Sequence, residues 1–529
     1  MDITAIRKGC ITVIDILAKI AIAAIGIVIF FTHLGKTGLF SLQGRVLIAD
    51  VIPNLVWGIG IILAYWGWNK IIKRRNERAL QIRTLLCMQI LLLLTQIFLA
   101  KQLFFYGGQD LGNVYMAAKI TAAGGQDAFF TQDYFQMCPN NLALYAIFLV
   151  ACKIEAVTGI NAYGILVGSS IVCANLAVLL IQMCLQEMKI DGHIRLVTYV
   201  ISIILIGLSP WIVVPYTDML SMMIPVLTFY LYLRLCAYKK HKRTIYFLLL
   251  FIPLLFSRLK ILNIIILLAM CIVEIVFGIR KRSKQAYVQG LVLTCIAILL
   301  VSSIVIGARK ELHYQADKDK ALSVEWFLLL GSNKESYGQW NKADYILAVE
   351  TPQSKTDRIQ TVEKTITNRI KEYGFMGSAE HIKNKIHIFF NDATFGFGIS
   401  GGFVGHMSPA KDQIQDAFRQ FFFPAENDNI ACSMKGYGKY HLAYMILCQV
   451  TWIMVIMGMI KLIWERVTVK EEKGMVLEVT FIGIFLFCML FEVSPRLLLS
   501  YLPIFILMAA LGYKGQYEKS HVTTIWQNR

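Results

Sequence analysis

Runs of mainly apolar residues recur along most of the chain, separated by short polar segments. A helix of about 20 apolar residues can cross the ~30 Å hydrocarbon core of a bilayer. We therefore predict an all-α polytopic membrane protein with about 12–13 transmembrane helices. The predicted spans cover 11–33, 46–69, 84–105, 141–159, 163–186, 196–214, 219–238, 244–257, 261–279, 286–308, 441–463, 475–491 and 496–513. The first run is too long for a secretory signal and has no small-residue cleavage site, so we expect it to be an anchor.

The composition agrees with this pattern. Of the 529 residues, 57% are hydrophobic and only 16% are charged, whereas soluble domains carry about 25% charged residues. This excludes a water-soluble enzyme as the bulk of the chain, and a chain so apolar is not intrinsically disordered.

The net charge of +18 indicates an orientation rather than a nucleic-acid partner. The segment 309–440 holds 17 basic and 16 acidic residues, so almost all of the excess lies elsewhere. Much of it sits near the N-terminus and in three short loops, at Arg7, Lys8, Lys70, Lys73, Arg74, Arg75, Arg78, Arg83, Lys239, Lys240, Lys242, Arg243, Arg280, Lys281, Arg282 and Lys284. Because basic loops stay in the cytoplasm, we predict a multi-pass cell-membrane protein with a cytoplasmic N-terminus.

The orientation makes 106–140 and 309–440 external, but it leaves a conflict. Asp110 and Asp218 are both expected outside, yet three predicted spans (141–159, 163–186 and 196–214) lie between them. One of these runs is therefore expected to be re-entrant, broken or wrongly divided, and irregular backbone at membrane depth lines protein or a cavity.

The chain divides into four parts by pattern. We expect a membrane hairpin with a basic loop at 1–83, a transmembrane core at 84–308, an external segment at 309–440, and C-terminal helices at 441–529. Within the external segment, apolar residues at helical spacing predict two amphipathic helices, listed as Ile359, Val362, Ile366 and Ile370, then Ile382, Ile386 and Phe390. These helices either pack on each other in a small subdomain or lie on the membrane surface.

Eight ionisable residues lie at the outer ends of the predicted spans. Such groups cost about 2.5–3.5 kcal/mol each at membrane depth, which makes them candidates for function. They are Asp110, Asp127, Asp133, Asp218, Arg258, Lys260, Glu492 and Arg496. We expect them to converge on one external cavity.

Each candidate also has a structural interpretation. Asp110 and Asp218 are placed to cap helices, as are Asn140 and Asn141. Arg258 and Lys260 can extend to the membrane interface, and Glu492 with Arg496 can form a local ion pair.

Other motifs are weak. The glycine-rich stretch 395–402 lacks the Lys-Ser/Thr ending of a phosphate loop, and no HExxH or CxxC motif suggests a metal site. A disulfide between Cys138 and Cys432 stays open, because sequence cannot test its geometry.

The order of these motifs resembles the GT-C glycosyltransferases, most closely the bacterial relatives of the protein O-mannosyltransferases. An acid in the first sizeable external loop precedes Tyr134-Phe-Gln-Met-Cys-Pro-Asn-Asn141, and Pro215–Asp218, Arg258–Lys260 and Glu492–Arg496 resemble later family motifs. The likeness covers about 84–310 and 475–513. The chain departs from the family in a lone Asp110 instead of an acidic pair, in Cys138 where relatives often have an aromatic residue, and in an added hairpin at 11–69.

This resemblance implies a polyprenyl-phosphate sugar donor and a glycan, lipid or protein acceptor at the external face. Asp110 would be the base that accepts the proton of the acceptor hydroxyl, a role worth about 100–10,000-fold in rate. Lys260, Arg258 and Arg496, in that order, would stabilise the leaving phosphate. The implied contacts to substrate are Asp133, Tyr134, Asp218 and Glu492. One base without a second nucleophile predicts single displacement with inversion. No cofactor is predicted, and a divalent metal stays open.

Two other functions fit a polytopic membrane protein. A transporter or flippase of lipid-linked glycans would show internal repeats and polar groups near the midplane, but no repeat is evident. A glycan polymerase or ligase would favour a basic external loop, whereas 309–440 is nearly neutral.

Overall fold

The computed structural model describes residues 3–34, 39–40, 46–47, 82–125, 133–237, 242–278, 284–312, 314, 317–322, 324–351, 354–398, 404–424, 438–465 and 472–527. The predicted span 46–69, apart from 46–47, lies outside these residues, as do Asp127 and Cys432.

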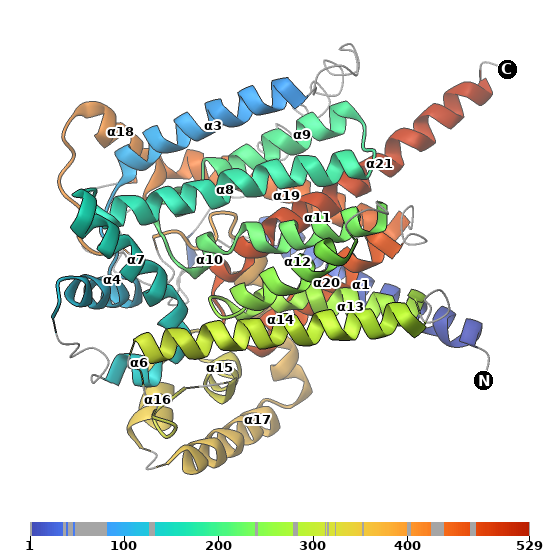
Figure 1. Ribbon diagram of the computed structural model, residues 1–529. Coiled ribbons are helices and arrows are strands. Elements are labelled where there is room, and N and C mark those ends of the chain that lie inside the picture. Colours follow the sequence, from blue (N-terminus) through green and yellow to red (C-terminus); the bar gives the residue numbers. More distant parts are fainter. Residues whose placement is uncertain are drawn as a thin grey trace.

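The chain folds as an all-α polytopic membrane protein, as predicted. Nine helical segments among the described residues have the length and composition of membrane spans: Gly9–Phe30, Thr84–Leu103, Pro139–Thr158, Ala162–Glu187, Thr217–Ala237, Val288–Glu311, Ala443–Trp464, Lys473–Leu490 and Pro495–Lys514. Most of the long helices run side by side in one bundle (Figure 1). Both termini lie at one end of the bundle, and we call the opposite end, which carries α4 (Gln109–Ala122) and α18 (Gln413–Phe422), the site end.

The remaining long elements are α1 (Ile3–Leu34), α3 (Ile82–Leu103), α7 (Leu142–Thr158), α8 (Ala162–Glu187), α9 (Gly192–Ser202), α11 (Met223–Ala237), α12 (Lys242–Phe256), α13 (Ile265–Gly278), α14 (Lys284–Glu311), α17 (Lys355–Phe390), α19 (His441–Glu465), α20 (Glu472–Leu490) and α21 (Leu502–Gln527). The short helices are α6 (Asp133–Met137), α10 (Thr217–Leu220), α15 (Val324–Gly331) and α16 (Lys342–Tyr345). Two short strands, β1 (Leu39–Phe40) and β2 (Val46–Leu47), pair antiparallel.

Among the described residues, nine long spans stand against the 12–13 predicted for the whole chain, because the run 46–69 lies mostly outside these residues and three other predicted runs form shorter or broken helices. The run 244–257 is the 15-residue α12, which contains Pro253. The run 261–279 begins with a 3-10 turn, Ile261–Ile264, before α13. The run 196–214 is the broken one: α9 continues as a π-helix over Ile203–Gly207 and ends before a 3-10 turn, Pro210–Val213. Pro210 lacks a backbone N–H and cannot continue the helix.

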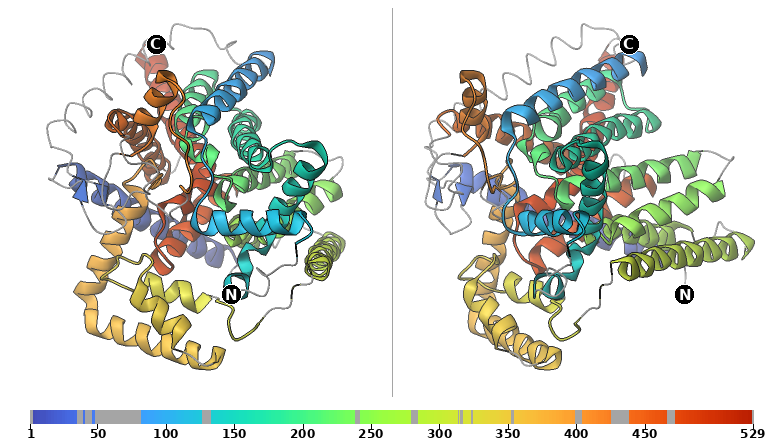
Figure 2. Two further views of the ribbon diagram at one scale, coloured as in Figure 1. Left: turned by 90° about the vertical axis from the view of Figure 1, so that its left-hand side faces the viewer. Right: turned by 60° about the vertical axis from the view of Figure 1, so that its left-hand side comes forward.

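The orientation conflict is removed by α7. Figures 1 and 2 show α7 and α4 lying across the site end of the bundle instead of running along it. Only α8 and the segment from α9 to the π-helix then cross between Asp110 and Asp218. Both acids therefore lie at the same end, as the sequence analysis expected.

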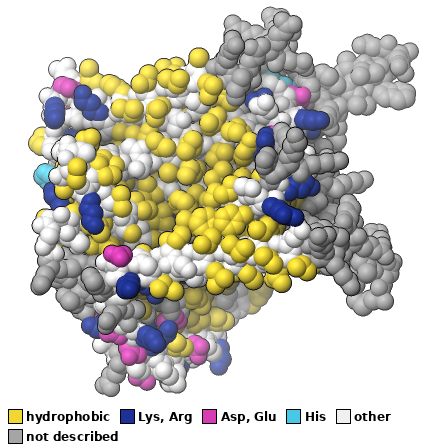
Figure 3. Space-filling model, viewed as in Figure 1, with side chains coloured by type: hydrophobic (Ala, Val, Ile, Leu, Met, Phe, Trp, Pro, Cys, Tyr) yellow, Lys and Arg dark blue, Asp and Glu magenta, His cyan; other side chains and the backbone are white. Residues whose placement is uncertain are grey.

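The outer face of the bundle is apolar. Figure 3 shows hydrophobic side chains covering its middle, with Lys and Arg towards the two ends. On α14, Leu291, Leu299 and Ile306 are each about two-thirds exposed. Exposed apolar groups in such numbers are stable against lipid, not water, which agrees with an integral membrane protein.

A small subdomain with its own apolar core lies beside the bundle (Figure 2). Trp326, Leu329, Leu330, Ala348 and Val362 form this core, and Ile366 packs against it. Val362 and Ile366 of the first predicted amphipathic stripe thus pack on the subdomain, whereas Ile370 of the same stripe is exposed. Gly374, with φ of 56°, bends α17 into two arms, and the second arm buries Ile386 and Phe390 in the main core. We call residues 324–390 the subdomain.

Candidate functional site

Three charged side chains from distant segments meet at the site end. The carboxylate of Asp218, on α10, accepts a hydrogen bond from Lys260 Nζ and another from Arg496 Nη1 at 2.6 Å. Lys260 directly precedes the turn Ile261–Ile264, and Arg496 lies in the 3-10 helix Pro495–Tyr501. Asp218 is 1% exposed and Lys260 is 6% exposed, and buried charges are retained only when they are paired. We call these residues the ion triad.

The ion triad corrects two interpretations of single residues. Asp218 does not cap a helix, because Tyr216 is the N-cap of α10 and the Asp218 carboxylate binds both cations. Arg496 pairs with Asp218, 278 residues away, instead of serving only a local pair with Glu492. With two cations and one acid, the triad carries one net positive charge.

A chain of polar contacts leads from the triad to the Pro-Asn-Asn motif. The Arg496 guanidinium lies 5.1 Å from the centre of the Tyr216 ring. The Tyr216 hydroxyl donates to Asn141 Oδ1 at 3.4 Å, and Asn141 Nδ2 donates to the Tyr134 hydroxyl at 2.7 Å. Asn141 occupies the N-cap position of α7, as predicted, but its side chain makes no capping bond and joins two tyrosines instead.

Asp110 faces the same region. It lies in the first turn of α4, whose N-cap is Gly108, so the expectation that Asp110 itself caps the helix is wrong. Burial, followed by the negative charge of Asp110, raises the pKa of Cys138 to about 12 and that of Tyr134 well above its usual range. Both groups therefore stay protonated near neutral pH, and both lie within electrostatic reach of Asp110.

The loop before Asp110 is held by residues far along the chain. Gly107 forms a bridge with Val404, and Gly405 N donates to Tyr106 O at 3.0 Å. A Cβ atom on Gly405 would lie 2.7 Å from the backbone of Gly107 and Gly108. Glycine at position 405 thus permits the close approach that fixes the loop.

Glu492 lies on the turn between α20 and Pro495, and its side chain is half-buried. Burial raises the pKa of Glu492 to about 7, an effect that Arg496 opposes and Asp110 reinforces. This carboxyl therefore exchanges a proton near neutral pH.

Two predicted site residues are not placed in this group. Arg258 is exposed on the turn after α12, and the ion pairs of the triad do not include it. Asp133 begins α6, but its side chain lies outside the described residues. Among the side chains that the structure describes, no group of three or more His, Cys, Asp or Glu could hold a metal ion.

Sequence reasoning missed Tyr216 and Lys385. Tyr216 lies inside the motif Pro215–Asp218, which was the available signal. Lys385 is one lysine in an amphipathic helix, and no local pattern in the sequence marks it as buried, whereas the structure leaves it 0% exposed.

Comparisons with known proteins identify a family. No curated protein and no solved structure matches the chain. A family model described as "Conserved hypothetical integral membrane protein" matches residues 41–517. Because this match covers most of the chain, the protein belongs to this family of conserved integral membrane proteins.

Proposed function

We propose that this protein is a membrane glycosyltransferase that transfers a sugar from a polyprenyl-phosphate donor to an acceptor hydroxyl. The observation that carries the proposal is the convergence of Asp110, Glu492 and the ion triad at one end of the bundle. Acids that accept a proton and cations that bind a phosphate are the two kinds of group such a transfer requires.

The ion triad supplies the positive charge for the leaving phosphate. Arg496 is the more accessible cation, with 17% of its side chain exposed against 5% for Lys260. A guanidinium also offers forked donors to phosphate oxygens. We therefore place Arg496 before Lys260 as the phosphate ligand, and Arg258 stays a prediction from the sequence.

In the proposed step, the acceptor oxygen attacks the anomeric carbon and forms the new glycosidic bond. The bond between that carbon and the phosphate oxygen breaks, and its electron pair goes to the polyprenyl phosphate. The acceptor proton passes to the Asp110 carboxylate, which stands in the first turn of α4. Displacement by one nucleophile inverts the anomeric centre.

The proposed orientation places the site end outside the cell. α12 starts at Lys242 and Arg243, and α14 starts at Lys284, at the end of the bundle that also holds both termini (Figure 1). Basic helix ends of this kind stay in the cytoplasm. A cysteine introduced at exposed Lys411, near α18, would then react with an impermeant maleimide added to intact cells.

Turnover of lipid-linked sugars tests the function. The purified full chain in nanodiscs is given a panel of polyprenyl-phosphate sugars, and transfer and donor hydrolysis are measured. Asp110→Asn is expected to lower kcat by about 100- to 10,000-fold, and Arg496→Met by about 100- to 1,000-fold. The matched control Glu363→Gln removes an exposed carboxylate on α17 and should leave kcat unchanged.

The outcomes separate the competing functions. Turnover by the wild type with an equally active Asp110→Asn variant would remove Asp110 from the role of base. Translocation of a fluorescent donor across the bilayer of proteoliposomes that contain the purified protein, without hydrolysis, would indicate a flippase. If no polyprenyl-phosphate sugar is bound, hydrolysed or moved, the proposed class is wrong.

A further inference from the structure

A buried lysine joins the subdomain to the turn that carries Glu492. Lys385, on the second arm of α17, is 0% exposed. Its Nζ donates to three carbonyl oxygens, those of Gly331 at 2.9 Å, Met489 at 2.8 Å and Phe491 at 2.8 Å. Three donors are available only from the charged ammonium, so the geometry is that of a cation.

Met489 lies in the last turn of α20, and Phe491 directly follows its last residue, Leu490. The last carbonyls of a helix have no partner within the helix and lie at the negative end of its dipole. An ammonium is the group that stabilises such an end. Burial lowers the pKa of Lys385 to about 7, and acceptors on three sides favour its charged form.

Two glycines allow the subdomain to approach this turn closely. A Cβ atom on Gly331 would lie 2.3 Å from Leu490 O and 2.6 Å from Phe491 C. Gly338, with φ of +80°, accepts a hydrogen bond from Val493 N at 2.7 Å. The bonds to Phe491 and Val493 flank Glu492 on both sides.

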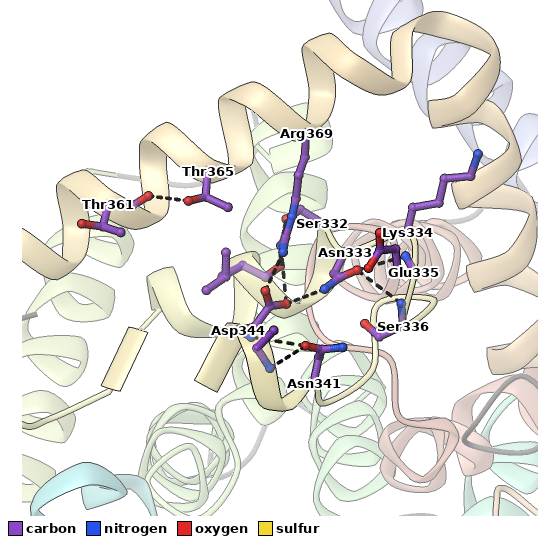
Figure 4. A network of polar contacts seen from close by, with 12 residues as sticks. Ser332, Asn333, Lys334, Glu335, Ser336, Asn341, Asp344, Thr361, Thr365 and Arg369 are labelled. Atoms are coloured by element: carbon purple, nitrogen blue, oxygen red, sulfur yellow. Dashed lines mark hydrogen bonds and ion pairs between the residues drawn. The ribbon is translucent and has the colours of Figure 1, made fainter. Parts of the chain in front are cut away.

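The subdomain side of this contact is itself fixed by a polar network (Figure 4). Arg369, on the first arm of α17, donates to Asp344 Oδ1 at 2.5 Å and to Leu329 O at 3.0 Å. Asp344 Oδ2 accepts from Asn333 Nδ2 at 2.8 Å. Asn333 Oδ1 in turn accepts from the backbone of Glu335 and Ser336. The loop from Gly331 to Gly338 thus has a defined conformation.

We propose that Lys385 is a positioning residue that holds the turn 489–493, and with it Glu492 and Arg496, in the geometry of the site. The subdomain then acts as a clamp on the site, and the clamp consists of the buried ammonium of Lys385 together with the bond from Val493 N to Gly338 O. The role of Lys385 in the reaction rests on the proposed function. The structural coupling between the subdomain and the turn does not.

Amide hydrogen exchange tests how firmly the turn 489–493 is held, and it does not require enzymatic activity. In the full chain, Lys385→Met keeps the apolar stem and removes the charge. We expect amide exchange in the peptide covering 489–496 to rise roughly 10- to 100-fold, since bonds to a charged donor are lost. Exchange in α19, which contributes none of the three carbonyls that Lys385 binds, should stay within about twofold. The matched control is Lys383→Met, which removes an exposed lysine from the same arm of α17.

Two further variants separate positioning from general destabilisation. Lys385→Arg keeps charge and donors and should restore slow exchange at 489–496 at least in part. Gly338→Ala perturbs the bond to Val493 from the opposite side and should also speed exchange there, so the test holds even if Lys385→Met does not fold. Unchanged exchange at 489–496 in both Lys385→Met and Gly338→Ala would overturn the proposal.

Enzyme kinetics provide a second test of the positioning role, and its outcome can be separated from the failure of the proposed function. With an active donor, Lys385→Met should lower kcat while the donor KM stays within about twofold, because Glu492 and Arg496 lose orientation in the transition state. Equal loss of kcat in Lys383→Met would contradict the positioning role. If no donor is ever turned over but exchange at 489–496 still rises in Lys385→Met, the proposed glycosyltransferase function is wrong, whereas the positioning of the turn by Lys385 is supported.

Discussion

Replacing Asp218 by asparagine is the most direct test of the ion triad, because this carboxylate pairs with both cations. The substitution keeps the size of the side chain but leaves Lys260 and Arg496 without their shared acid. Both cations lose a charged hydrogen bond, and Lys260 stays buried at 6% exposure. Removing one partner of a buried pair costs about 3–5 kcal/mol in the free energy of unfolding, so we expect a loss in that range.

The arrangement also predicts an order among variants. Arg496→Met leaves the buried pair of Asp218 and Lys260 intact and should cost less, roughly 1.5–3 kcal/mol for a bond to a charged group. In the double variant Asp218→Asn with Lys260→Met, one of the stranded cations is gone. Its cost should therefore fall below the sum of the two single costs by about 0.5–3 kcal/mol.

Reversible unfolding in mixed micelles of sodium dodecyl sulfate, followed by tryptophan fluorescence, gives the free energies. The control is Glu187→Gln, which breaks the half-exposed pair between Arg234 and Glu187 and should cost no more than about 1 kcal/mol. If Asp218→Asn costs no more than this control, or less than Arg496→Met, the buried triad is refuted.

Three further predictions concern the surroundings of the triad. Gly405→Ala should cost about 1–3 kcal/mol in unfolding and lower turnover, because its Cβ meets the Gly107 backbone, whereas Gly168→Ala, with open space around it, should be neutral in both assays. Asn141→Leu should destabilise the fold by about 1–3 kcal/mol by leaving the Tyr134 and Tyr216 hydroxyls without this partner; no change in unfolding would contradict the contact. Glu492 has a folded pKa of about 7 against an ordinary 4.5, so its stabilising contribution is complete below pH 4.5 and is lost as the pH rises through 7. Free energies of unfolding measured across this window should show a downward slope in the wild type that Glu492→Gln lacks.

Hydropathy predicted the membrane class and the long apolar helices of the described bundle, since the length of an apolar run directly reflects the thickness of the bilayer. It did not predict the helices outside the apolar runs, such as α4 and α18. Hydropathy did not predict the direction in which a helix runs or the residue at which it ends. The run that became α7 is as apolar as a true span, and only its contacts with α4 and α8 show that it lies across the end of the bundle. The run 196–214 is apolar throughout, so hydropathy does not reveal that the helix ends before Pro210.

The candidate site shows the same limit at the level of single residues. Asp218, Lys260 and Arg496 are candidates from the sequence because charges at membrane depth are costly. The sequence does not show which of them pair, because the partners of Asp218 lie 42 and 278 positions away. The substrate contact expected of Asp218 stays a prediction, and the structure shows this carboxylate paired with two cations. Lys385 was not selected, because a lysine in a polar segment is normally solvated and nothing local marks it as buried.

The pairing of Asp218 narrows the choice of base. A carboxylate that already binds two cations is a weak proton acceptor, because both partners favour its charged form. Among the described acids near the triad, Asp110 and Glu492 then remain for the acceptor proton. Their roles separate in a profile of kcat against pH: if Asp110 is the base, Asp110→Asn abolishes turnover at every pH, while Glu492→Gln removes only the inflection near pH 7. If Glu492→Gln abolishes turnover and Asp110→Asn keeps that inflection, the proton goes to Glu492, and Asp110 instead serves to raise the pKa of Glu492 by its charge.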